Sequence, residues 1–252
     1  MEDIIKYLAW TNSTACSLTH DFGGNVVFTV GLDGQKAVCL DPLVRPERSS
    51  GGWPVVTTKF TECLVYSFGI NNDWTFDEAM EAFGCRVYAF DPSMIATNHN
   101  HTSKIHFYNL GLGDRDETWR KDPKTTKNWK MKSLDSIYYN FLKHEGKIID
   151  YLKIDIEFSE WIVLPQILAS GLMDRVRQLG VEIHFLRDDD TLDEIRQRVK
   201  ILKSLEDYGL VRFDSKTNPL SLDWKVIDGA DWLGYNAYEI FWYNSKLVRN
   251  LQ

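Results

Sequence analysis

From Cys63 onward, short apolar runs alternate with segments of helical pattern, and this alternation constrains the fold more than any other feature of the chain. The expected strands are residues 63–68, 86–90, 104–110, 150–156 and 178–184. The expected helices between them are residues 73–83, 134–141, 159–170 and 191–208. Such alternation is typical of βαβ units and predicts an α/β fold with a mostly parallel sheet and helices on both faces. Two final strands, 210–213 and 237–242, have no clear helix between them and predict an antiparallel edge.

The first 60 residues lack a clear period. We expect a helix at residues 3–10 and a strand pair at 26–30 and 37–40, joined by loops. This interpretation divides the chain into an N-terminal cap or lid, residues 1–60, and a single globular unit, residues 61–252. A chain of 252 residues is long enough to bury one large core.

The formal net charge of −7 argues against broad affinity for nucleic-acid backbones, which requires a basic surface. One basic stretch predicts a local patch or, as the preferred interpretation, a solvated loop. Its members are Arg115, Arg120, Lys121, Lys124, Lys127, Lys130 and Lys132. No apolar stretch is long enough to span a bilayer, and the N-terminus is too short and acidic for a secretory signal. The compartment stays open between the cytoplasm and, for a fragment of a longer precursor, the secretory-pathway lumen.

The four cysteines form no CxxC pair, which argues against a zinc site. They are Cys16, Cys39, Cys63 and Cys85. Cys63 and Cys85 each precede an expected strand, so their thiols could bridge if those strands are neighbours. Two buried reduced thiols are the alternative. Residues 12–14 and 100–102 are Asn-X-Thr sequons, but a chain with this much Asn, Ser and Thr produces such matches by chance.

Gly69, Asp91 and Asp114 follow the first three expected strands. In an open α/β sheet, ligands bind beyond the carboxyl ends of the strands, where the strand order reverses. Gly69 would let the backbone pass close to a ligand. Asp91 lies about 20 residues beyond the first turn, where a carboxylate can accept both hydroxyls of a ribose. Asp114 could receive an adenine amino group. A simple turn is the alternative at each position.

The fourth and fifth expected strands end in three acids and a histidine. Because strand side chains repeat every second residue, Asp155 shares a face with Glu157, and Glu182 shares one with His184. We expect the four side chains to meet at one mouth, with His184 as general base because its unperturbed pKa lies near neutrality. The alternatives are a divalent cation held by the same cluster and a purely structural histidine in the core.

Four segments carry a family resemblance: VYSFGI at 65–70, AFDPSM at 89–94, LKIDIE at 152–157 followed by Glu160-Trp161, and QLGVEIH at 178–184. They resemble the methyltransferase-like 24 group, which belongs with the FkbM-type methyltransferase domains. The likeness extends from about Cys16 to the end of the chain. It implies a Rossmann-like class I methyltransferase sheet of seven strands, the last in sequence inserted antiparallel. It also implies S-adenosylmethionine as cofactor and methyl transfer, with oxygen favoured, to an acceptor that the sequence does not identify.

The resemblance also implies roles for individual residues. The implied cofactor-binding residues are Ser67, Phe68, Gly69, Asp91, Pro92, Ser93, Asp114 and Asp155. The implied catalytic residues, at the methyl-transfer mouth and the acceptor side, are Asp155, Glu157, Glu182 and His184.

The sequence departs from the family pattern at two places, and the first departure motivates an alternative function. Ser67 stands where many class I enzymes carry an acid, and the first turn has only one glycine, Gly69. Phe158 stands where FkbM-type domains usually carry glycine, and would narrow the pocket or tilt the following helix. The alternative is a cofactor-binding or scaffold protein without turnover. A nicotinamide-dependent reductase would require GxGxxG, which the sequence lacks.

Overall fold

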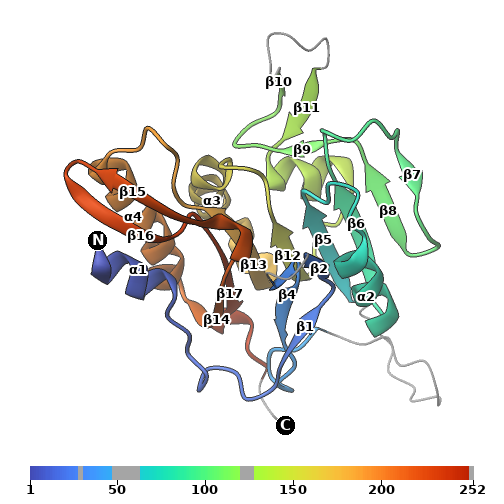
Figure 1. The fold of residues 1–252 in the computed structure, drawn as a ribbon. Coiled ribbons are helices and arrows are strands. Elements are labelled where there is room, and N and C mark those ends of the chain that lie inside the picture. The colour runs from blue at the N-terminus through green and yellow to red at the C-terminus, as the bar shows by residue number, and fades with distance from the viewer. Residues whose placement is uncertain (28–30, 47–62, 120–127, 250–252) are drawn as a thin grey trace.

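A central sheet of eight strands organises the computed structural model, which describes residues 1–27, 31–46, 63–119 and 128–249. In spatial order the strands are β14 (Leu210–Thr217), β17 (Ala237–Asn244), β13 (Val176–His184), β12 (Ile149–Ile154), β5 (Leu64–Phe68), β6 (Arg86–Phe90), β8 (Ile105–Tyr108) and β7 (His99–Asn100). The five strands from β13 to β8 are parallel to one another, and β17 is antiparallel to both of its neighbours. The predicted α/β fold with a mostly parallel sheet is therefore confirmed (Figure 1).

The strand order agrees with the sequence-based expectation at one end of the sheet and differs from it at the other. The last strand in sequence, β17, is inserted antiparallel between β13 and β14, so it lies one position inside the edge. At the other end, the short antiparallel strand β7 brings the total to eight rather than seven. Between β5 and β12 the order reverses, since the chain runs outward from β5 through β6 to β8 and then returns to β12. This reversal is the place where an open α/β sheet binds ligands.

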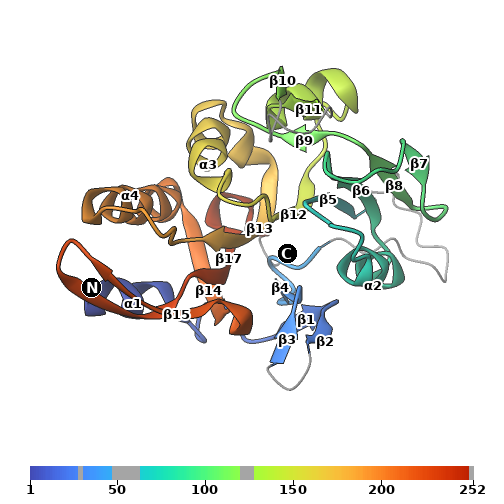
Figure 2. The ribbon, with the colours of Figure 1, turned by 45° about the horizontal axis from the view of Figure 1, so that its top comes forward.

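Helices cover both faces of the sheet, as predicted (Figure 2). They are α2 (Thr75–Phe83), the π-helix η1 (Ser136–Phe141), α3 (Glu160–Ala169) and α4 (Leu192–Tyr208). Adjacent residues of β5 point to opposite faces. Val65 packs in one cluster with Phe76 of α2, whereas Tyr66 packs in another with Ile167 of α3 and Leu202 of α4.

The ends of the helices follow local signals in the sequence. Helix α4 begins with a capping box between Thr191 and Glu194 and ends at Gly209, which adopts left-handed backbone angles. Helix α2 ends in the same way at Gly84. The kink or break predicted at Pro165 does not end α3, which is one continuous element around it.

The N-terminal segment forms α1 (Glu2–Leu8) and two small sheets. Strand β1 (Thr19–Phe22) pairs with β4 (Lys36–Cys39), and β2 (Asn25–Val27) pairs with β3 (Gly31–Asp33). The predicted pairing of 26–30 with 37–40 is therefore wrong, because β2 pairs with β3 and β4 pairs with β1 instead. Residues 28–30 and 47–62 lie outside the described part.

Buried polar bonds join β4 to the central sheet. The Gln178 side chain accepts a hydrogen bond from the Cys39 backbone N–H at 2.9 Å and donates one to the Cys39 carbonyl at 2.8 Å. The Tyr151 hydroxyl donates to the Ala37 carbonyl at 2.8 Å. A buried polar group must find such a partner to avoid a desolvation cost, so these bonds fix the position of β4.

All four cysteines form disulfides. Cys63 and Cys85 directly precede the adjacent strands β5 and β6 and are bonded to each other, so the bridge that neighbouring strands would allow is present. The second bridge, Cys16–Cys39, was not predicted, and it ties the segment after α1 to β4. No thiol is free.

Two hairpin-like extensions leave the central sheet (Figure 1). One contains β9 (Gly111–Leu112), β10 (Glu117–Trp119) and β11 (Trp129–Lys132), and the other contains β15 (Leu222–Ile227) and β16 (Ala230–Tyr235). Short 3₁₀ turns are η2 (Leu172–Arg175), η3 (Pro219–Ser221) and η4 (Ser245–Leu247). Within the described residues, none of the helices has the length and apolarity needed to cross a bilayer.

The predicted basic stretch lies on the first of these extensions. Residues 120–127 fall outside the described part. Of the others, Arg115 pairs with Asp114 and Glu117, and Lys132 pairs with Asp116. Acids of the same extension therefore neutralise these two basic side chains.

Candidate functional site

A cavity of about 430 Å³ opens beyond the carboxyl ends of the parallel strands, at the reversal between β5 and β12. Its lining comes from the carboxyl ends of β5, β6, β12 and β13 and from β9 and β11. Asp33 of β3 and Asn218 after β14 complete it. The lining residues are Asp33, Gly69, Asn71, Asp91, Pro92, Ser93, Gly111, Leu112, Trp129, Met131, Asp155, Ile156, Glu157, Ser159, Glu182, His184 and Asn218. Five are carboxylates, and the only cationic side chain among them would be a protonated His184.

Gly69 joins the two sides of this cavity. Its φ of +73° is a backbone conformation that favours glycine. A Cβ atom there would lie 1.5 Å from the Asp155 carbonyl oxygen, so no side chain fits. The Lys153 ammonium donates a hydrogen bond to the Gly69 carbonyl at 2.7 Å, which further holds the turn against β12. The close approach that Gly69 permits is therefore to the chain itself, at the rim of the cavity.

Asp91 holds the β5 and β6 tips together. Its Oδ2 accepts a hydrogen bond from the Asn71 backbone N–H at 2.9 Å. Its Oδ1 accepts from the Ser93 backbone N–H at 2.7 Å and from the Ser93 hydroxyl at 2.6 Å. A carboxylate has about four lone-pair sites, and these bonds use three. One site remains for a ligand hydroxyl, rather than the two that a grip on both ribose hydroxyls requires.

Asp155, Glu182 and His184 meet on the opposite side, as the strand periodicity predicts. One potential ligand atom from each lies within 4.8 Å of the others. Burial raises the pKa of Asp155 to about 7, and the neighbouring Glu182 carboxylate acts in the same direction. Lys153, 3.8 Å from Asp155, opposes this rise without cancelling it. Asp155 is therefore the side chain here that can both hold and release a proton near neutral pH.

His184 is held by carboxylates on both ring nitrogens. Its Nδ1 lies 3.1 Å from the fully buried Glu160, and its Nε2 lies 3.6 Å from the exposed Glu157. Burial acts to lower the pKa of His184, but the bond to Glu160 and the nearby acids outweigh it and raise that pKa to about 9. An imidazole that keeps its proton at neutral pH is not a general base there, so the basis for the predicted role is missing.

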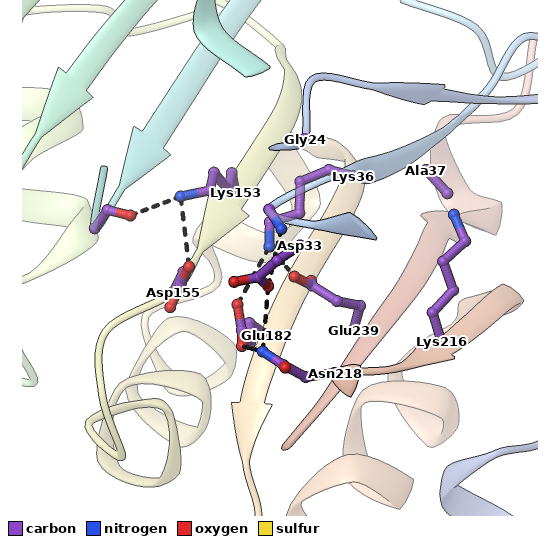
Figure 3. Close-up of polar contacts among 12 residues, drawn as sticks. Gly24, Asp33, Lys36, Ala37, Lys153, Asp155, Glu182, Lys216, Asn218 and Glu239 are labelled. Atoms are coloured by element: carbon purple, nitrogen blue, oxygen red, sulfur yellow. Dashed lines mark hydrogen bonds and ion pairs between the residues drawn. The ribbon is translucent and has the colours of Figure 1, made fainter. Parts of the chain in front are cut away.

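Lys36 lies next to the site, outside the lining, beside Glu182 and Glu239 (Figure 3). Glu182 of β13 and Glu239 of β17 lie directly opposite each other, and the buried Lys36 ammonium contacts both carboxylates, at 3.5 Å from Glu182. Burial works against ionisation of Glu182, yet the charges of Lys36 and His184 lower the pKa of Glu182. Asn218 donates a hydrogen bond of 2.8 Å to the same carboxylate.

These contacts bear on the metal alternative. Asp155, Glu182 and His184 have the chemistry of a cation site, but Glu182 is engaged by Lys36 and Asn218. A divalent cation would have to displace a buried ammonium or lie close to it. The arrangement thus favours ion pairing within the protein over metal binding.

Phe158 occupies a strained turn directly after β12. Glu157 and Phe158 both have positive φ, +54° and +70°, where glycine is the favoured residue. The Phe158 ring does not line the cavity; the Arg187 guanidinium lies 4.2 Å from its centre, and the His184 ring lies 5.5 Å away. The predicted narrowing of the pocket is therefore absent among the lining residues, and the backbone angle at Phe158 is one that glycine would adopt without strain.

The cavity gathers most, but not all, of the predicted site residues. Ser67 and Phe68 are buried within β5, and Asp114 forms an ion pair with Arg115 outside the lining. Sequence reasoning missed ten residues, namely Asp33, Asn71, Gly111, Leu112, Trp129, Met131, Ile156, Ser159, Asn218 and the supporting Lys36. Five of them had a usable signal, because they end or closely follow an expected strand: Asn71, Gly111, Leu112, Ile156 and Ser159. The others come from segments without a recognisable motif.

Comparisons with known proteins show which family this chain is similar to. A family described as "Methyltransferase domain" matches residues 12–227. Two curated relatives, each named "Probable methyltransferase-like protein 24", are the human protein, 27% identical over 73% of this chain, and the Rattus norvegicus protein, 31% identical over 73%. Each match covers 51% of the relative, so the chain spans about half the length of these relatives. The resemblance predicted from the sequence is confirmed.

One solved structure also shows a weak likeness. A putative hemolysin from Streptococcus thermophilus aligns with 72% of this chain and 58% of its own, at 13% identity and a TM-score of 0.34. This similarity is below the level that indicates a shared fold.

Proposed function

This chain belongs to the methyltransferase domain family that matches its residues 12–227, and from that membership and the cavity we propose that it binds S-adenosylmethionine and transfers the methyl group, with oxygen as the favoured acceptor atom. The observation that carries the proposal is the joint placement of Asp91 and Asp155 on one cavity across the strand reversal. The antiparallel insertion of β17 between β13 and β14 supports it, since this is the order implied for a Rossmann-like class I sheet.

The residues present fit this cofactor. A volume of about 430 Å³ lies within the range of about 300–1,000 Å³ usual for such sites. The carboxylates of the lining suit a molecule with a sulfonium and an ammonium group. Gly111 has no side chain, and a Cβ there would lie 2.4 Å from Met131 and 2.9 Å from Pro92, so the glycine lets these two lining side chains pack close to the backbone of β9.

In this proposal, the half of the cavity at the ends of β5 and β6 binds the cofactor, and the half at the ends of β12 and β13 acts on the acceptor. The cofactor supplies an electrophilic methyl group. Asp91 accepts a hydrogen bond from a hydroxyl of the cofactor's sugar. The turn at Gly69, held by Lys153, borders the methionine end of the cofactor. Asp155 takes the proton of the acceptor hydroxyl, because its pKa of about 7 suits a general base. His184 keeps its own proton and offers the acceptor oxygen a hydrogen-bond donor and a positive charge.

Calorimetry with S-adenosylmethionine tests the cofactor assignment. Loss of one hydrogen bond to a charged group costs about 1.5–3 kcal/mol, so Asp91→Ala should weaken binding by about 10- to 100-fold. Asp91→Asn, which keeps the shape of the rim, should give a smaller loss. Asp114→Ala is the matched control and should bind like the parent, since Asp114 lies outside the lining. Unchanged affinity in both Asp91 variants would remove the assignment.

Release of S-adenosylhomocysteine separates the enzyme from the cofactor-binding scaffold that the reduced glycine turn favours. Binding with release, over a panel of hydroxylated acceptors, supports turnover. Tight binding without release over the whole panel supports the scaffold.

A further inference from the structure

The two sequons of the chain lie on the protein surface, outside the proposed active site. Asn100 is exposed on β7, and Asn12 is partly exposed in the turn that follows α1. Neither residue lines the cavity, so a bulky group on either would leave its mouth unobstructed. The sequence alone gave these matches little weight, because Asn-X-Thr occurs by chance.

The side chains of the first sequon are arranged around its amide. The Thr14 hydroxyl donates a hydrogen bond of 2.7 Å to the Asn12 side-chain oxygen, which leaves the amide nitrogen out of this bond. Ser13 and Thr14 are exposed. A sugar attached to this nitrogen would therefore extend toward solvent from a turn, without displacing a buried group.

The second sequon lies at the edge of the central sheet. Strand β7 is the last strand of the sheet beyond β8, and its outer side has no neighbouring strand among the described residues. An exposed edge strand can pair with another chain, and a strand of only two residues already limits this. A glycan on Asn100 would cover the edge further.

An independent observation points to the compartment where this modification takes place. All four cysteines are paired, as Cys16–Cys39 and Cys63–Cys85. Disulfides persist in the secretory pathway and outside the cell and are rare in the reducing cytosol. The same lumen holds the machinery that modifies asparagine in Asn-X-Ser/Thr.

We propose that this chain matures in the secretory pathway and carries N-linked glycans at Asn12 and Asn100. The donor is an oligosaccharide linked to a lipid diphosphate. The asparagine amide nitrogen forms a bond to C1 of the first sugar, the bond from C1 to the diphosphate oxygen breaks, and one amide proton leaves with the lipid diphosphate. No oxidant or reductant takes part.

The test uses the endogenous protein, isolated with an antibody and treated with peptide N-glycosidase in heavy-oxygen water. The enzyme converts each glycosylated asparagine to a labelled aspartate, which peptide mass spectrometry locates. We expect the label at both positions. Endogenous protein that carries no label at either position overturns the proposal, and a label at one site alone overturns the assignment at the other.

Sequon variants, directed into the secretory pathway of cultured eukaryotic cells by a cleavable leader, provide the matched controls. Thr14→Ala and Thr102→Ala should each remove one glycan, whereas Thr14→Ser and Thr102→Ser should retain it. Thr102 also binds Glu81 and two backbone N–H groups, so Asn100→Gln is a second variant if Thr102→Ala fails to fold. Retention of the full glycan mass in Thr14→Ala or Thr102→Ala contradicts the assignment at that sequon.

Discussion

The two halves of the cavity are built in different ways. On the β5–β6 half, Asp91 is satisfied by Asn71 and Ser93, which lie 20 and 2 residues away in sequence. On the β12–β13 half, the Glu182 carboxylate is paired with the Lys36 ammonium, which comes from the N-terminal strand β4. The first half is assembled by its own loops, whereas the second is complete only when distant segments meet.

The difference also appears in the electrostatics. Backbone N–H groups balance the carboxylate of the first half, and these donors do not titrate. The second half balances buried carboxylates with ammonium and imidazolium groups, and its members Asp155 and His184 have strongly raised pKa values. A half whose carboxyl titrates near pH 7 suits proton transfer, and a half whose carboxylate is held by backbone N–H groups suits binding.

Removal of Lys36 should give the largest effect and test whether the second half depends on β4. Lys36→Met leaves Glu182 and Glu239 buried without their shared cation, and loss of one member of a buried ion pair costs about 3–5 kcal/mol. Urea denaturation measures this loss. Lys216→Met, which removes a more exposed ammonium near Asp21, should cost less than about 1 kcal/mol. Equal losses would mean that Lys36 has no special role.

Asp155→Asn should lower kcat by about 100-fold or more, the usual effect of losing a positioned general base. In the parent protein kcat should rise as pH increases through about 7, because Asp155 then loses its proton. This acid limb should be absent from the variant, while cofactor affinity stays close to that of the parent. The control is Asp114→Asn, a carboxylate outside the lining of the cavity. A pH profile shared by Asp155→Asn and the parent would contradict the assignment.

The pH dependence of stability should report on His184 with a smaller effect. The folded protein raises its pKa from 6.5 to about 9, so its stabilising contribution is fully present below pH 6.5 and is lost as pH rises through about 9. From 1.36 kcal/mol per pKa unit, the loss is about 1–3 kcal/mol. Chemical denaturation at pH 6 and pH 9.5 measures this loss of the free energy of unfolding. His184→Gln, which has no imidazole to titrate, is the control. A parallel decline in both proteins would show that other groups cause it.

The same contrast explains what the sequence could predict. Strand β6 was predicted at its observed bounds, and β5 within one residue, because buried parallel strands are short apolar runs. Asp91 and Asp155 follow such strands directly, so their positions could be read locally. The Lys36–Glu239 contact joins residues 203 apart, and no local pattern encodes it.

Two further errors have physical causes. Strand β15 exposes three of its four apolar side chains, Leu222, Trp224 and Val226, so its pattern does not mark a core element and the hairpin with β16 was missed. The pKa of His184 was taken as unperturbed, because Glu160 is 24 residues away and its burial against the imidazole becomes visible only in three dimensions.

The bare backbone at Gly69 bears on how such a domain can change its substrate. Because the turn touches the Asp155 carbonyl with no side chain between them, the closest approach of the β5 tip to the β12 tip is a main-chain contact. Replacement of other lining side chains, such as Asn218 or Ser159, would then leave that contact intact. Side chains of the lining can therefore vary while the distance between the two strand tips is kept.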